Sequence, residues 1–298
     1  MNQGGFDQGS VEGGDAGTAT DGAAGAGRAP GLGAVVAAFF SGLAAALALT
    51  ALSTLVSRSL AVTFLLGEIG FLGGVVVYLA ASGRHVGRAL RLGRVPSAAF
   101  SLALQLGVAL LFANLAATVL LGPPAQDIEF VTEAEGAAER IAMAVGVALA
   151  APVIEEALFR GLLQGVLESR LRHWYAIAVT AIAFGLMHGR DGALFFFLWS
   201  LPVGWVTWRS GSILPAVVVH AVNNAVGLLS LLASGSVEPE SIEYGPGALS
   251  VALTILLIAG YWAFRVCVRA NRLAGLAERG SRARRGSVRS FADRSKQE

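Results

Sequence analysis

Residues 141–160 read IAMAVGVALAAPVIEEALFR. No charge interrupts the stretch from Ile141 to Ile154, and two carboxylates, Glu155 and Glu156, then stand side by side. An uncharged run of this kind is typical of a helix that crosses a membrane. A carboxylate at the centre of a bilayer costs roughly 2.5–3.5 kcal/mol on insertion scales. The two glutamates therefore need a structural or functional reason.

Similar apolar runs fill most of the chain. Of its 298 residues, 55% are hydrophobic and 14% charged, against about 25% charged in soluble domains. Helices are expected rather than strands, because the backbone groups of a lone segment in lipid must find their partners within that segment. We expect an all-α, polytopic membrane helix bundle of about eight transmembrane helices. The expected spans are residues 32–56, 60–82, 98–121, 140–169, 174–188, 193–208, 213–232 and 248–268.

The charges between the spans alternate in sign. Arginine gathers after the second, fourth, sixth and eighth spans, as Arg84, Arg88, Arg91, Arg94, Arg170, Arg172, Arg209 and a cluster from Arg269 to Arg294. Acidic residues gather before the fourth span and after the seventh, as Asp127, Glu129, Glu133, Glu135, Glu139, Glu238, Glu240 and Glu243. Basic loops favour the cytoplasmic side, so both termini are predicted to lie inside. Arg58 and Arg190 depart from the pattern.

The ends of the chain differ in composition from the spans. Residues 1–30 are rich in Gly and Ala and have too few apolar side chains to offset the entropy of ordering, which predicts a disordered tail. Residues 31–270 form the transmembrane domain, and residues 271–298 are expected to be a basic, disordered tail. This tail either lies on anionic lipid or only flanks the last span. We read the basic charge as membrane orientation and expect no nucleic-acid partner. The single Cys267 excludes an internal disulfide and a multi-cysteine zinc site.

The two glutamates are expected to have different surroundings. Arg160 lies four residues after Glu156, so the two side chains share a helix face and can pair. Glu155 then faces about 100° away around the helix. An interfacial ion pair near the end of the span is the structural alternative, and it explains Glu156 better than Glu155. Glu68, in the second span, is a further carboxylate whose role stays open.

Two histidines lie in other spans. His188 ends the fifth span, and His220 and Asn224 share one face of the seventh. Each alone is more often a helix-packing residue, and Asn114 and Gln105 are expected to form hydrogen bonds between helices. Glu155 and His188 lie at similar distances from the turn that joins their spans, so an antiparallel hairpin places them at similar height. Three helices can thus direct a carboxylate, two imidazoles and an amide into one cavity, a set suited to water activation.

Three motifs in this part of the chain resemble a known family. EEALFRG at residues 155–161 is similar to its EExxxR motif, FGLMH at residues 184–188 to its FxxxH motif, and HAVNN at residues 220–224 to its HxxxN motif. The lead-in RSGSI at residues 209–213 is also typical. This is the CPBP family of intramembrane proteases, relatives of CAAX prenyl endopeptidases and bacteriocin-processing proteins. The resemblance covers about residues 140–227.

The resemblance implies an intramembrane endopeptidase that hydrolyses a peptide bond of a membrane-associated or lipidated substrate. It implies that Glu155 is the general base assisted by His188, and that His220 and Asn224 stabilise the oxyanion. Glu156 and Arg160 support the site. His188 and His220 are the candidate zinc ligands, but HExxH is absent, so zinc and a metal-free reaction both stay open. A membrane transporter and a catalytically silent scaffold are the alternatives. The expected location is the plasma membrane of a prokaryote.

Overall fold

The computed structural model describes residues 30–121, 134, 136–234 and 245–294, and within these ranges all regular structure is helical. Each of the eight predicted spans coincides with helix. The first three are α1 (Leu32–Val56), α2 (Leu60–Ala81) and α4 (Ser97–Leu121), with the short α3 (Val86–Ala89) before α4. The last four are α9 (His173–Met187), α10 (Gly189–Ser210), α11 (Leu214–Ser234) and α12 (Pro246–Arg294).

The fourth span is one continuous helix with two wider turns. It consists of α6 (Ala137–Val145), the π-helical turn η1 (Gly146–Ala150), α7 (Ala151–Glu156), a second π-helical turn η2 (Ala157–Leu163) and α8 (Gln164–Glu168). π-Helical turns are rare and occur frequently at functional sites. Here they lie immediately before and after the short segment that ends in Glu155 and Glu156.

Five helices among the described residues are long and apolar enough to cross a membrane: Leu32–Val56, Leu60–Ala81, Ser97–Leu120, Ala137–Glu168 and Pro246–Ala270. His173–Met187 and Leu214–Leu229 are shorter apolar helices. The all-helical membrane fold is therefore confirmed. The count of eight spans and the inward orientation of both termini stay predictions.

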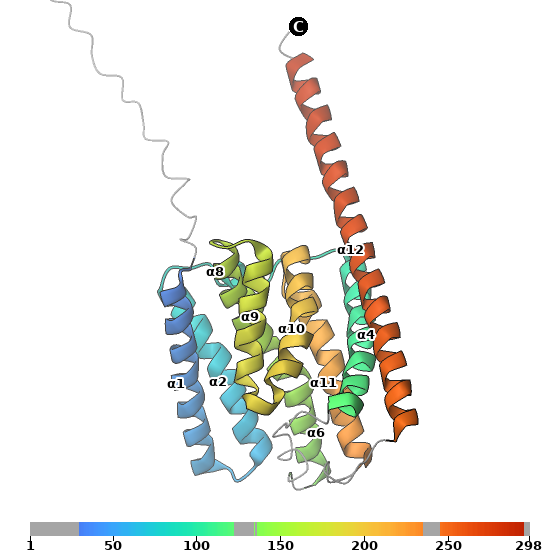
Figure 1. The fold of residues 1–298 in the computed structure, drawn as a ribbon. Helices are drawn as coiled ribbons and strands as arrows, with labels where there is room; N and C mark the ends of the chain where they lie inside the picture. The colour runs from blue at the N-terminus through green and yellow to red at the C-terminus, as the bar shows by residue number, and fades with distance from the viewer. Residues whose placement is uncertain (1–29, 122–133, 135, 235–244, 295–298) are drawn as a thin grey trace, which may run out of the picture.

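The C-terminal region differs from the expectation of disorder. The last helix continues to Arg294, and Figure 1 shows it extending beyond the ends of the other helices. Residues 271–294 contain seven arginines and four alanines, and both residue types favour helix. The predicted N-terminal tail, apart from Pro30, lies outside the described residues. So do the acidic loop residues from Asp127 to Glu133, Glu135, and the three from Glu238 to Glu243.

The first two helices form a close antiparallel hairpin (Figure 1). A Cβ atom on Gly70 would lie 2.8 Å from the carbonyl oxygen of Ala45, and one on Gly74 would lie 2.4 Å from that of Ser41. Small residues four apart let two helix backbones approach closely, which is how membrane helices gain packing energy without a hydrophobic driving force.

The fourth span lies between α2 and α11. On one side, a Cβ on Gly146 would lie 2.6 Å from the ring of Phe64 in α2. On the other side, the Asn224 side chain in α11 donates a hydrogen bond to the carbonyl oxygen of Val147 at 3.0 Å. Further along, α9 and α10 pack on each other, and Phe159, Phe184, Trp199 and other large side chains form the main core beside η2. The two glutamates are thereby held at the centre of the bundle.

Candidate active site

Glu156 is the anchor of a buried polar network. Its Oε1 atom accepts hydrogen bonds from Arg160 Nη1 and from His220 Nδ1, both at 2.9 Å. Arg160 also donates from Nη2 to the Ser200 hydroxyl at 2.7 Å, and its guanidinium lies 4.3 Å from the ring centre of Phe184. Glu156 and Arg160 are fully buried. The structure thus contains the predicted pair and adds partners from α10 and α11.

Glu155 has different surroundings. Its side chain is 31% exposed, and its Oε2 atom lies 4.0 Å from His188 Nε2 and 3.9 Å from His220 Nε2. This oxygen is buried and has no hydrogen-bond partner among the described residues. A buried polar atom without a partner needs an explanation such as a role in chemistry. Three helices therefore bring one carboxylate and two imidazoles together, as the sequence suggested.

The two imidazoles present the same nitrogen to Glu155. His188 Nδ1 lies 2.8 Å from the carbonyl oxygen of Phe184, and His220 Nδ1 lies 2.9 Å from the Glu156 carboxylate. Both partners are acceptors, so each Nδ1 must carry the proton and donate it. When the rings are neutral, each Nε2 has a free lone pair facing the Glu155 carboxylate. Neighbouring groups thus fix the tautomer of both rings.

Aromatic side chains enclose the imidazoles. The His188 ring stacks on Phe196 with 4.0 Å between ring centres, and the Trp199 ring meets the His220 ring edge-on at 4.8 Å. His220 is only 5% exposed, whereas the His188 side chain is 26% exposed. His220 is therefore shielded by its neighbours, while Glu155 and His188 are partly exposed.

Asn224 lies one helical turn from His220 on the same face of α11. One of its amide N–H groups donates to Val147, which leaves its second N–H available. No contact joins Asn224 directly to the other three predicted site residues among the interactions described. Its neighbour Asn223 has a structural role, because it bridges α4 and α11 through Asn114 at 2.8 Å and the Gly107 carbonyl at 3.0 Å.

Glu68 lies near the candidate site. It is half-buried on α2, one turn beyond Phe64 on the face that meets the fourth span. Its carboxylate is close enough to Glu155 for the two to interact electrostatically. The expectation for Gln105 is wrong, because its side chain bonds to Ser101 in its own helix rather than to another helix.

Some contributors were not predicted from the sequence. Ser200, which follows Arg160 by 40 residues in the chain, accepts a hydrogen bond from the Arg160 guanidinium. The buried Gln164 side chain donates to the Gly204 carbonyl oxygen at 2.9 Å. Trp199 covers His220. A serine or a tryptophan in an apolar run is common and gives no signal by itself, because its role depends on which helix it faces.

The donor types suit zinc, which binds imidazole and carboxylate groups. Two ligands at ~2.0–2.1 Å around a tetrahedral ion lie about 3.4 Å apart. The contacts of Glu155 with the two imidazoles are wider, at 3.9 and 4.0 Å. Among the residues that the structure describes, no three His, Cys, Asp or Glu side chains are placed to hold a metal ion. As they stand, the residues do not fit the ion, and no step below passes through one.

Membrane-length apolar helices around a buried cluster of glutamate and histidine define an integral, multi-pass membrane protein. Residues 137–226 match the family model described as type II CAAX prenyl endopeptidase Rce1-like. The match runs from the first turn of α6 into α11 and includes all three motifs. The resemblance is thereby confirmed for the part of the chain that carries the site. No curated protein and no solved structure matched the chain.

Proposed function

We propose that the chain is an intramembrane endopeptidase that hydrolyses a peptide bond of a membrane-associated or lipidated substrate. One observation carries the proposal: the unpartnered Oε2 of Glu155 faces two imidazole Nε2 atoms from two other helices, at 4.0 and 3.9 Å. A carboxylate and an imidazole directed at one point can hold a water molecule and take its proton.

Glu155 is the general base of the proposed reaction. It removes a proton from water, with the His188 Nε2 lone pair as a second acceptor that orients the molecule. The water oxygen then forms a bond to the carbonyl carbon of the substrate. Glu155 returns the proton to the amine as the carbon–nitrogen bond breaks, so that one water is consumed for each acid and amine released. General acid–base catalysis of this kind contributes about 10²–10⁴-fold to the rate.

His220 and Asn224 are the proposed oxyanion donors. Because His220 Nδ1 donates to Glu156, Nε2 can donate only when the ring is an imidazolium. Asn224 adds the N–H that is not bonded to Val147. Donors placed where negative charge develops are often the largest single contribution to such a reaction.

The proposed substrate class follows from the opening of the site and from the family. The side chains of Glu155 and His188 are 31% and 26% exposed, whereas those of His220 and Glu156 are buried. A peptide can therefore approach the base where Glu155 and His188 are exposed. The matched family is described by its action on prenylated CAAX ends, so a lipidated C-terminal peptide is the first substrate to test.

The test compares purified wild type with Glu155→Gln in lipid nanodiscs. The probes are a peptide with a prenylated C-terminal CAAX cysteine and the same peptide without the lipid, with products identified by mass spectrometry. We expect wild type to cleave the probe and Glu155→Gln to lose at least about 10²-fold in kcat. Gln105→Leu should retain activity, because this half-buried side chain bonds only within α4 among the residues that the structure describes.

Two results would overturn the proposal. Cleavage by Glu155→Gln at the wild-type rate would remove Glu155 from the reaction. A folded wild type that cleaves neither probe, nor membrane peptides of other sequence, would favour the transporter or scaffold alternatives.

A further inference from the structure

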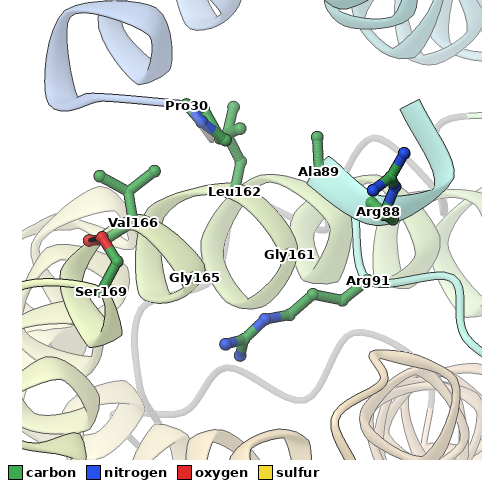
Figure 2. A pocket seen from close by; sticks show the side chains of 9 residues that line it. All are labelled: Pro30, Arg88, Ala89, Arg91, Gly161, Leu162, Gly165, Val166 and Ser169. Atoms are coloured by element: carbon green, nitrogen blue, oxygen red, sulfur yellow. Dashed lines mark hydrogen bonds between the residues drawn. The ribbon is translucent and has the colours of Figure 1, made fainter. Parts of the chain in front are cut away.

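A small cavity lies at the end of the bundle where α1 begins, away from the glutamates. It has a volume of about 180 Å³ and lies between the start of α1, the α3 segment and the helix η2–α8 (Figure 2). Its lining residues are Pro30, Arg88, Ala89, Arg91, Gly161, Leu162, Gly165, Val166 and Ser169. Because the apolar helix α1 starts two residues after Pro30, the cavity lies at the level where the chain enters the membrane.

Glycine forms one wall of this cavity. A Cβ on Gly161 would lie 2.8 Å from the carbonyl oxygen of Leu90, and one on Gly165 would lie 3.3 Å from Arg91 Nε. The α3 segment therefore lies directly on the helix, and the Arg91 side chain extends along it towards Gly165, as Figure 2 shows. Larger residues at these two positions would push the α3 segment and the Arg91 side chain away from the helix.

The charged side chains that line the cavity are both arginines. Arg91 pairs through Nη2 with Glu168, while its Nη1 atom is buried and has no partner among the described residues. Arg88 adds a second, exposed guanidinium. The Arg170 guanidinium lies against the chain beside the cavity, because a Cβ on Gly31 would be 3.4 Å from its Nη2. Three guanidinium groups thus lie at or beside the cavity, and one of them, that of Arg91, is paired with a carboxylate.

From this arrangement we infer that the cavity binds the phosphate group of an anionic phospholipid. A guanidinium with an N–H to spare suits phosphate oxygens, because its fork of donors matches their geometry. Leu162, Val166 and Pro30 supply an apolar wall that a free ion would not use. Basic pockets between membrane helices at the surface of a bilayer are known to take anionic headgroups.

The bound lipid would act on the helix that carries the candidate site. Gly161 follows Arg160 directly, and Leu162 and Val166 lie in the next turns of the same helix. A headgroup held here joins α3 to η2 and α8, and so stabilises the segment on which the Arg160–Glu156 pair depends. The inference does not require peptidase activity.

The experiment measures lipid binding to the full chain. Purified protein in a neutral detergent is titrated with fluorescent phosphatidylglycerol, and separately with phosphatidylcholine and with inorganic phosphate as competitors. We expect saturable binding that phosphatidylcholine and millimolar phosphate do not displace. Arg88→Gln should raise the half-saturating lipid concentration by about fivefold, the effect of one basic residue near a membrane surface.

Arg94→Gln is the matched control. It removes the same charge from the same loop, but Arg94 does not line the cavity. The half-saturating lipid concentration of Arg94→Gln should change less than twofold. Any lipid bound by the basic C-terminal helix contributes equally to Arg88→Gln and Arg94→Gln, so it does not affect the comparison. Arg91→Lys keeps the charge but loses the second arm of the fork, and it should weaken binding as well.

Equal effects of Arg88→Gln and Arg94→Gln would overturn the inference, because the binding would then reflect only general charge. Full displacement by inorganic phosphate would also overturn it, since the site would then recognise a free anion rather than a lipid.

Discussion

Replacing Glu156 by glutamine should destabilise the protein far more than the same change at Glu155. Glu156 and Arg160 are fully buried, and the Glu156 carboxylate is the direct ionic partner of the guanidinium. Glutamine keeps an oxygen that can accept from His220 but removes the charge. Breaking a buried ion pair by removing one partner costs about 3–5 kcal/mol. Arg160 keeps its hydrogen bond to Ser200 and its cation–π contact with Phe184 at 4.3 Å, so the charge is not left without partners and we expect a loss near the lower end.

The measurement is the free energy of unfolding in mixed detergent micelles with increasing SDS. A loss of about 3 kcal/mol is a change of more than a hundredfold in the unfolding equilibrium. Glu155→Gln is the matched control, because Oε2 of Glu155 has no hydrogen-bond partner within the described part of the chain and its side chain is 31% exposed. The stability of this variant should remain close to wild type.

A double variant separates the charge from the contact. Glu156→Leu combined with Arg160→Met removes both charges, and apolar replacement of a buried pair is often neutral. The double variant should therefore be more stable than Glu156→Gln alone, although Ser200 and His220 each lose a partner. Equal stability of Glu155→Gln and Glu156→Gln would refute the reasoning.

Two further predictions follow from the arginine loops and from the helix contacts. Arg94→Cys, in a Cys267→Ser background, should react with a membrane-impermeant maleimide only after the cells are opened; labelling of intact cells would place this loop outside and reverse the topology. Gly74→Leu should lower the free energy of unfolding by at least about 1–3 kcal/mol, because its Cβ would lie 2.4 Å from the Ser41 carbonyl oxygen. Gly73→Leu, with nothing within 4 Å of its Cβ, is the control in the same titration and should stay near wild type.

The parts of the site that could be predicted are those governed by local geometry. The Glu156–Arg160 pair follows from a spacing of four residues on one helix. The similar height of Glu155 and His188 follows from the turn between their helices. The hydrogen bond from His220 to Glu156 joins residues 64 apart in the chain, and no spacing rule reaches that far.

The parts that could not be predicted depend on packing. Ser200 and Trp199 differ from other polar and aromatic residues in the spans only through the helix they face. Gln105 carries the same kind of amide as Asn114, yet its hydrogen bond stays within α4, whereas the Asn114 side chain bonds to Asn223 in α11. The π-helical turns also have no sequence signature that we could use, because they arise from the fit of the whole helix between α2 and α11.

The two π-helical turns have a consequence for how this helix tolerates changes in length. A π turn, closed by i→i+5 hydrogen bonds, holds about one residue more than an α turn. Loss of one residue from Gly146–Ala150 could therefore convert η1 to an ordinary turn while the segments on either side keep their facing. The number of residues between Glu139 and Glu155 thus does not by itself fix the direction in which the Glu155 side chain points. A deletion that would rotate the glutamates away from both histidines in a uniform α-helix would here be absorbed within a single turn.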